Sequence, residues 1–158
     1  GSASPTRFAV AEYSYRNLIL NLDLSKPFAV DWLSNPLNVA YGIEFRHEMY
    51  ETSAGEEVSY IAGPLAADGA PIGVQGNAGL RPEDAVDVSR EEVGVYLDLE
   101  SEVTDRLLLG AAARLEHYSD FGETLDGKLS ARFAVTPQLA LRGSVGTGFR
   151  APSLILLC

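Results

Sequence analysis

The chain has 158 residues, of which 46% are hydrophobic and 22% are charged, and its formal net charge is −10. This length and composition are those of one folded domain. The acidic balance argues against a nucleic-acid-binding protein, which needs a basic surface. No apolar run approaches the ~18–20 residues of a membrane helix, which excludes a helical membrane protein but not a β-barrel with alternating strands. The single cysteine, Cys158, excludes an intrachain disulfide.

The first predicted strand covers residues 12–24, where four leucines at every second position form one apolar face. Tyr13 and Tyr15 have the opposite parity, so we expect a bulge or a boundary near 16–17. A connection follows, bracketed by the dipeptides Lys26-Pro27 and Asn35-Pro36.

The second predicted strand, 36–51, alternates without interruption and is followed by a long loop at 52–89. Compact soluble domains seldom contain a loop of this length without a functional reason. The segment 51–92 holds nine acidic residues against two arginines. A solvated external loop is the favoured interpretation, and an acidic ligand or cation site is the alternative.

Four more strands follow in quick succession, and no helical period competes with their alternation. The connections at 104–106 and 136–138 are minimal turns, whereas those at 52–89 and 119–123, at the opposite rim, are longer. The four predicted strands are 91–103, 107–117, 124–136 and 139–149.

Within residues 37–49, 93–103, 107–117, 125–135 and 139–149 of the last five strands, the charged residues all share one face. Twelve Asp, Glu, Lys and Arg residues lie at even-numbered positions, opposite the apolar odd-numbered ones, as expected for a two-faced sheet. They are Glu44, Arg46, Glu48, Asp98, Glu100, Glu102, Arg114, Glu116, Asp126, Lys128, Arg132 and Arg142.

Strand length and loop asymmetry then favour a membrane barrel over a soluble sandwich. Strands of about 11 residues match a tilted membrane crossing of ~9–11 residues and exceed the usual globular ~5–6. Short turns at one rim and long loops at the other are typical of bacterial outer-membrane barrels. We therefore predict an all-β, antiparallel up-and-down meander of about six long strands, part of a transmembrane β-barrel. Its odd-numbered face would meet lipid and its even-numbered face a wet lumen.

Aromatic side chains near the strand ends are predicted to form interfacial girdles, with ordinary core packing as the alternative. Phe28 and Trp32 are assigned to the periplasmic rim. The outer rim is assigned Phe45, Tyr50, Tyr118, Phe121 and Phe149.

Three arginines, Arg114, Arg132 and Arg142, are predicted to form a basic ladder on the charged face of consecutive strands. We expect this ladder to pair with Asp126, Glu116 or Asp98 across the strands, and contact with a ligand is the minority alternative.

No catalytic, metal-binding or cofactor-binding residues are predicted. His47 and Glu48 are neighbours on a strand and point to opposite faces, so they cannot share a metal. The run Gly146-Thr147-Gly148 lacks the helix and lysine of a phosphate loop. Because nothing combines a nucleophile, a base and an oxyanion site, we expect a protein that is not an enzyme and has no cofactor.

The sequence GSVGTGFRAPSL at 143–154, entered from the strand LALR, resembles the barrel motif of TonB-dependent outer-membrane receptors. The wider run 98–154 and the strand PLNVAYGIEFRHEMYE also resemble this family, so that the resemblance covers about residues 12–154. We assign the motif a structural role. Its residues are Gly146, Gly148, Phe149, Arg150, Ala151, Pro152 and Ser153.

The resemblance implies a bacterial outer-membrane barrel of about 22 strands, plugged by an N-terminal domain. It further implies import of a scarce small molecule (a siderophore, haem, cobalamin or oligosaccharide) with energy from TonB. The expected partners are outer-membrane lipid, the receptor's own plug domain, the TonB complex and an unidentified small-molecule ligand, without nucleic acid.

The chain departs from the family by omission. It has about six strands, no plug and no TonB-contacting segment, so we expect residues 1–158 to be a partial barrel domain. Two alternatives stay open: a soluble β-sandwich binding or adhesion module that uses the 52–89 loop, and a passive porin-type channel.

Overall fold

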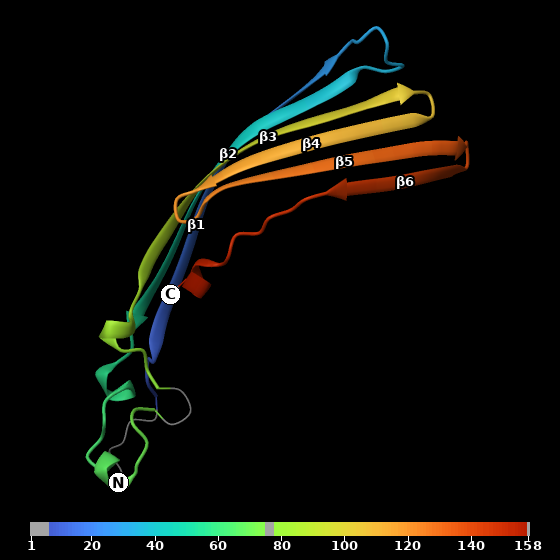
Figure 1. Ribbon diagram of the computed structural model, residues 1–158. Helices are drawn as coiled ribbons and strands as arrows, with labels where there is room; N and C mark the ends of the chain where they lie inside the picture. Colours follow the sequence, from blue (N-terminus) through green and yellow to red (C-terminus); the bar gives the residue numbers. More distant parts are fainter. Residues whose placement is uncertain (1–6, 75–77, 158) are drawn as a thin grey trace. The chain divides into compact units, whose positions relative to one another are not determined.

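The computed structural model describes residues 7–74 and 78–157, which form one six-stranded antiparallel sheet. The strand order in the sheet is the order along the chain (Figure 1). This confirms the predicted all-β meander. The strands are β1 (Ala11–Phe28), β2 (Leu37–Ala54), β3 (Asp87–Thr104), β4 (Leu107–Tyr118), β5 (Gly122–Thr136) and β6 (Leu139–Gly146).

Strands β2 and β3 each have 18 residues, more than the sequence predicts, and the long loop between them shortens to 55–86. The remaining elements are short 3₁₀ turns, none of which is long and apolar enough to cross a membrane in the described part of the chain. They are η1 (Glu57–Ser59), η2 (Ala66–Asp68) and η3 (Pro82–Asp84) in the loop, and η4 (Leu154–Leu157).

The register of the sheet places the odd-numbered apolar residues in rows across the strands. Leu99 lies opposite Ala111, Ala111 opposite Leu129, and Leu129 opposite Val145. Because successive side chains of a strand point to opposite faces, all four share the apolar face. We use the term charged face for the other side, which carries the even-numbered residues of β2–β6.

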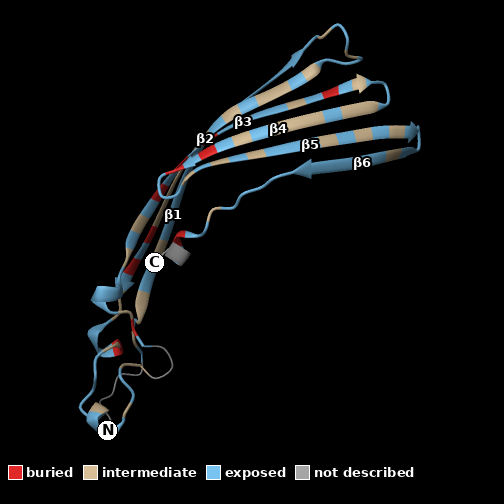
Figure 2. Ribbon diagram, viewed as in Figure 1, coloured by how far each residue is buried: buried red, intermediate tan, exposed pale blue. Residues whose placement is uncertain are grey.

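Burial is inverted relative to a soluble protein. Over residues 87–97 of β3, exposed residues alternate with less exposed ones, and the exposed ones include Val93, Val95 and Leu97 (Figure 2). The buried ones include the charged residues Arg90 and Glu92. Nearer the end of the strand, the charged residues Asp98, Glu100 and Glu102 are exposed as well. Soluble proteins place aliphatic side chains inside and ionised ones outside, whereas a membrane barrel exposes its aliphatic face to lipid.

The two short turns after β3 and β5 are built alike. The Oγ1 atom of Thr104 accepts the N–H groups of Arg106 and Leu107, and Oγ1 of Thr136 accepts those of Gln138 and Leu139. The hydroxyl thus satisfies backbone donors that the turn would otherwise leave open. The shared sequence Val-Thr-x-x-Leu specifies both turns.

Residue contacts divide the chain into two compact units. The first comprises residues 1–17, 48–89 and 152–158, and the second comprises 18–47 and 90–151.

In the first unit, Ser59 is the centre of the hydrogen bonds in the described parts of the loop, 55–74 and 78–86, and it is fully buried. The carbonyl oxygen of Ser59 accepts the N–H groups of Val74 and Gly79, both at 3.0 Å. Its Oγ donates to the carbonyl of Glu56 at 2.6 Å. One buried residue therefore joins three stretches of the loop.

The segment before β1 also bonds to this loop. Glu56 N–H donates to the carbonyl of Ala9 at 2.8 Å, and Leu80 N–H donates to that of Val10 at 2.7 Å. The loop is therefore fastened at both of its ends.

Strand β1 runs unbroken through the position where a bulge or boundary was expected, although the division between the two contact units falls there. The Tyr15 hydroxyl donates to the Glu48 carboxylate. Tyr15 therefore lies on the same face as a charged residue of β2. The opposite parity of the tyrosines and leucines simply reflects the two faces of one continuous strand.

In the second unit, β6 ends at Gly146, three residues before the predicted end at Phe149. Thr147 N–H still donates to the carbonyl of Gly127 at 2.9 Å, but Gly127 N–H bonds to Oγ1 of Thr147. A side chain replaces the backbone acceptor at this position, so the strand ladder stops. The prediction that Phe149 continues the alternation is wrong.

Candidate functional site on the charged face

Arg114 is the centre of an ion-pair network on the charged face. From β4 its guanidinium reaches Glu44 of β2 at 3.2 Å and Glu92 of β3 at 3.7 Å, and it also pairs with Glu116 on its own strand. Arg46 lies 3.0 Å from Glu44 and 3.8 Å from Glu92. Three carboxylates and two guanidinium groups thus link β2, β3 and β4.

A glycine makes the reach of Arg114 possible. A Cβ atom on Gly94 would lie 2.9 Å from an Arg114 terminal nitrogen, so a side chain there would block the route across β3. Glycine inside a strand often marks such a close approach.

A second long side chain crosses β2 in the same way. The Tyr96 hydroxyl donates to Oδ1 of Asp23 on β1 at 2.7 Å. A Cβ atom on Gly42 would lie 2.6 Å from the Tyr96 ring. Arg114 and Tyr96 therefore cross-link the first four strands through two glycine positions.

The predicted arginine ladder forms only in part. Arg114 pairs with Glu116 along its own strand rather than across strands, and its partners on other strands are Glu44 and Glu92. Asp126 lies opposite Arg114 in the register, and its carboxylate accepts the N–H of Phe149 at 3.0 Å. Arg132 lies directly opposite Arg142. Like charges so placed repel, so these two residues do not form a ladder with Arg114.

An aromatic cluster forms at the outer end of the charged face. The Tyr118 and Phe121 rings stack at 4.3 Å, and the Phe149 ring lies 5.3 Å from Phe121 and 6.1 Å from Tyr118. The Arg90 guanidinium lies 5.3 Å from the Phe121 ring centre. It also donates to Oδ2 of Asp120 at 2.6 and 2.8 Å.

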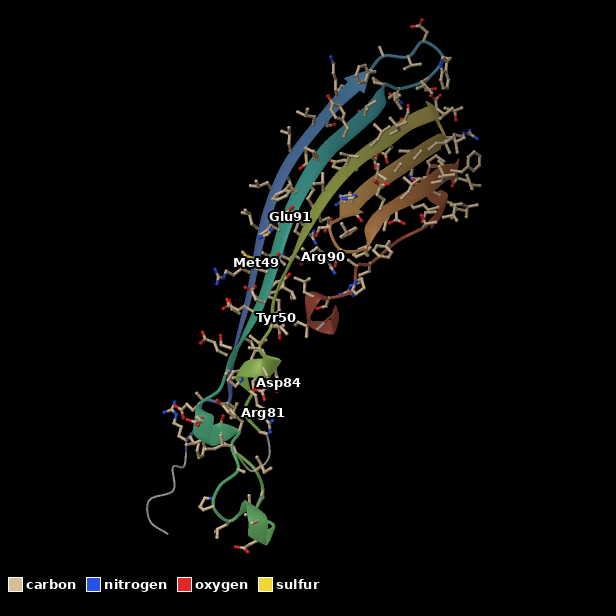
Figure 3. The ribbon with its side chains drawn as sticks, turned by 60° about the vertical axis from the view of Figure 1, so that its left-hand side comes forward. Met49, Tyr50, Arg81, Asp84, Arg90 and Glu91 are labelled. Atoms are coloured by element: carbon tan, nitrogen blue, oxygen red, sulfur yellow. The ribbon has the colours of Figure 1, made fainter. Side chains whose placement is uncertain are left out.

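This cluster corrects the predicted outer girdle. Arg90 and Glu91 follow one another on β3 and point to opposite faces (Figure 3). Arg90 is only 2% exposed, and Tyr118 and Tyr50 are buried. Tyr118, Phe121 and Phe149 pack on one another. Packing, the alternative, therefore holds for the buried Tyr118, whereas Phe121 and Phe149 contact it and remain exposed. Phe28 and Trp32 are exposed, and their place in a periplasmic girdle stays a prediction.

No metal site was predicted, and within residues 7–74 and 78–157 no three His, Cys, Asp or Glu side chains gather into one. Nδ1 of His47 lies 3.7 Å from Glu91, and Nδ1 of His117 lies 3.7 Å from Glu123. Each is a separate pair on its own part of the sheet.

The loop 55–86 presents both apolar and acidic side chains to its surroundings. Val58, Ile61, Leu65 and Ile72 are exposed. Near the end of the loop, Asp84 is the last residue of η3 and Arg81 is the residue before η3 (Figure 3). Asp84 N–H donates to the Arg81 carbonyl at 3.1 Å.

A six-stranded antiparallel meander with an exposed aliphatic face and a cross-linked charged face defines the class as part of a transmembrane β-barrel. A family model described as TonB dependent receptor-like, beta-barrel matches residues 2–156. The chain therefore belongs to this family of outer-membrane receptors and transporters. It matches no curated protein and no solved structure significantly.

The residues of the family motif lie in different surroundings in the structure. Gly146 ends β6, and a Cβ atom there would lie 2.8 Å from the carbonyl of Gly127. Gly148 faces open space, and Phe149 enters the aromatic cluster. Arg150 and Ser153 are exposed, and the Ser153 Oγ accepts the N–H of Ile155 at 3.3 Å. Ala151 is half-buried and Pro152 is exposed.

Replacing Phe149 by alanine is expected to loosen the segment 147–151, because its ring contacts hold it against Tyr118 and Phe121. The expected local loss is about 1–2 kcal/mol. Hydrogen exchange at residues 147 and 149 of the full-length protein measures it. Gly148→Ala, which adds a methyl group into open space, is the control. Unchanged exchange in Phe149→Ala would contradict the role of the cluster.

Proposed function

We propose that this chain is a stretch of the barrel of a TonB-dependent receptor that imports a scarce small molecule. The ligand classes are siderophores, haem, cobalamin and oligosaccharides. The import uses energy from TonB, acting through a plug domain encoded outside residues 1–158. In this proposal the protein is not an enzyme, and the motif residues shape the barrel.

The inverted burial of the sheet is the observation that carries the proposal. Val93, Val95 and Leu97 of β3 are exposed, whereas Arg90, Glu92 and Gly94, which point to the other face of the same strand, are buried. A soluble sandwich would cover these aliphatic residues with a second sheet, whereas a barrel turns them toward lipid. The family match supports the same choice.

The ordered loop 55–86 is the proposed ligand-contacting element. Long external loops of barrels carry binding residues on a rigid scaffold. This loop is fastened through Ser59 and through residues 9 and 10, so its exposed side chains need little ordering on binding.

Uptake measurements test the proposed function. Cells that depend on the full-length receptor are given a ferric siderophore, haemin, cyanocobalamin or a maltooligosaccharide. Uptake of one of these should stop when TonB is deleted or a protonophore collapses the proton gradient. Uptake that persists under both conditions would show a passive channel instead.

Replacing residues 56–79 by a short Gly-Ser linker should weaken binding of the imported compound by at least about tenfold, equivalent to a loss of ~1.4 kcal/mol. Barrel assembly should persist, because the sheet pairs through other residues. Heat-modifiable electrophoretic mobility checks assembly, and ligand titration of the purified receptor checks affinity. Unchanged affinity would remove the loop from the binding site.

A further inference from the structure

The apolar face carries a groove of about 560 Å³ that the proposed function does not use. Side chains of β3, β4, β5 and β6 form its floor, and the connection 29–36 forms one wall. Its lining is almost wholly apolar. Among the lining residues are Leu99, Leu109, Leu129, Val145, Val30 and Trp32.

On β5 and β6, the groove follows a pair of small residues that lies between two pairs of large ones. Ala131 of β5 lies opposite Gly143 of β6, and both point to the apolar face. A Cβ atom on Gly143 would meet no heavy atom within 4 Å. The adjacent rows are Leu129 with Val145 and Phe133 with Leu141.

The wall of the groove is held in place by hydrogen bonds. Ser101 Oγ donates to the carbonyl of Asn35 at 3.1 Å, and the Asn35 amide donates to the Glu102 carboxylate. Leu33 N–H donates to the carbonyl of Val30 at 3.0 Å. Trp32 is thereby kept beside the groove with 76% of its surface exposed. Tryptophan is enriched where a protein meets the membrane–water interface.

We propose that this groove binds one acyl chain of a phospholipid from the periplasmic leaflet. The inference rests on the proposed function, which places the apolar face in the outer membrane. An almost wholly apolar groove on that face takes hydrocarbon in preference to any polar ligand. The groove lies toward the end of the sheet that carries the short turns after β3 and β5, which are periplasmic in such barrels.

Native mass spectrometry of the full-length receptor, purified in mild detergent from outer membranes, tests the proposal. The wild-type receptor should retain one phospholipid, mainly phosphatidylethanolamine, through washing. Gly143→Leu adds a side chain whose Cβ atom meets no heavy atom within 4 Å and which enters the groove from β6. It should lower retention by about tenfold, because several methylene contacts are lost. Ala131→Leu fills the same row from β5 and should do the same.

Gly127→Leu is the matched control. Gly127 points to the same face of β5, lies outside the groove, and a Cβ atom there makes only an ordinary 3.8 Å contact. Its phospholipid retention should equal that of the wild type.

Equal retention in the control and both filling variants, no retained lipid in the wild type, or retained lipopolysaccharide would each overturn the proposal. Membrane fractionation distinguishes failure of the groove proposal from failure of the proposed receptor function. A receptor found in the outer membrane without a retained phospholipid refutes only the groove, whereas a receptor absent from that membrane refutes the proposed function.

Discussion

Replacing Arg114 by alanine is expected to destabilise the barrel by about 2–3 kcal/mol, somewhat less than the 3–5 kcal/mol found when one partner of a fully buried ion pair is removed. The arginine contacts Glu44, Glu92 and Glu116, and the last two of these are buried. Its removal leaves three carboxylates close together with one guanidinium, that of Arg46. The side chain of Arg114 is 33% exposed, so water offsets part of the loss.

Urea unfolding of the full-length receptor in lipid vesicles measures this loss. Arg142→Ala is the matched control, because Arg142 is an exposed arginine on the same face and lies opposite Arg132. Removing one of two facing like charges should leave stability unchanged or slightly raised. If both variants unfold at the same urea concentration, the Arg114 network contributes nothing to the barrel.

The strands and their two faces are predictable from the sequence because both depend on a local signal with a period of two. Alternation fixes which side chains share a face, and the Val-Thr-x-x-Leu repeats mark the turns. The family motif at 143–154 then predicts that the strands belong to a membrane barrel. None of this requires knowledge of contacts between residues far apart in the chain.

Two features were predicted wrongly, the end of β6 and part of the outer aromatic girdle. Both depend on contacts of individual side chains, which the alternation of the sequence does not show. Alternation continues through Phe149 in the sequence, but the Thr147 hydroxyl takes a ladder position and ends β6. Tyr118 and Phe121 resemble girdle residues until the chain after β6 brings Phe149 against them.

The side chains that cross between strands on the charged face are harder to predict from the sequence than the alternation of the strands. Gly42 and Gly94 both occupy charged-face positions, where a missing side chain signals that a neighbour passes over the strand. That signal indicates a crossing but does not name Tyr96 or Arg114. Ser59 gave no signal at all, because a loop has no period and its partners lie up to twenty residues away.

Replacing Gly73 by alanine is expected to unfold the loop 55–86 locally while the sheet stays intact. Gly73 has a φ of +68°, and a Cβ atom there would lie 2.2 Å from the Ser59 carbonyl oxygen. The left-handed conformation alone costs alanine about 1–2 kcal/mol, and the clash with a backbone atom raises the total to about 3–5 kcal/mol.

A series of glycine variants separates these two causes. Gly69 has a φ of +87° but nothing within 4 Å of an added Cβ, so Gly69→Ala should show only the conformational cost. Gly63→Ala, with open space and no positive φ, should be neutral. Hydrogen exchange at the amides of Val74 and Gly79, which bond to Ser59, reports opening of the loop. We expect the exchange rates to rise in the order Gly63→Ala, Gly69→Ala, Gly73→Ala, with urea unfolding of the sheet unchanged. Equal exchange rates for Gly69→Ala and Gly73→Ala would mean that Ser59 does not hold the loop together. The proposal that the loop is a preformed binding surface would then be wrong.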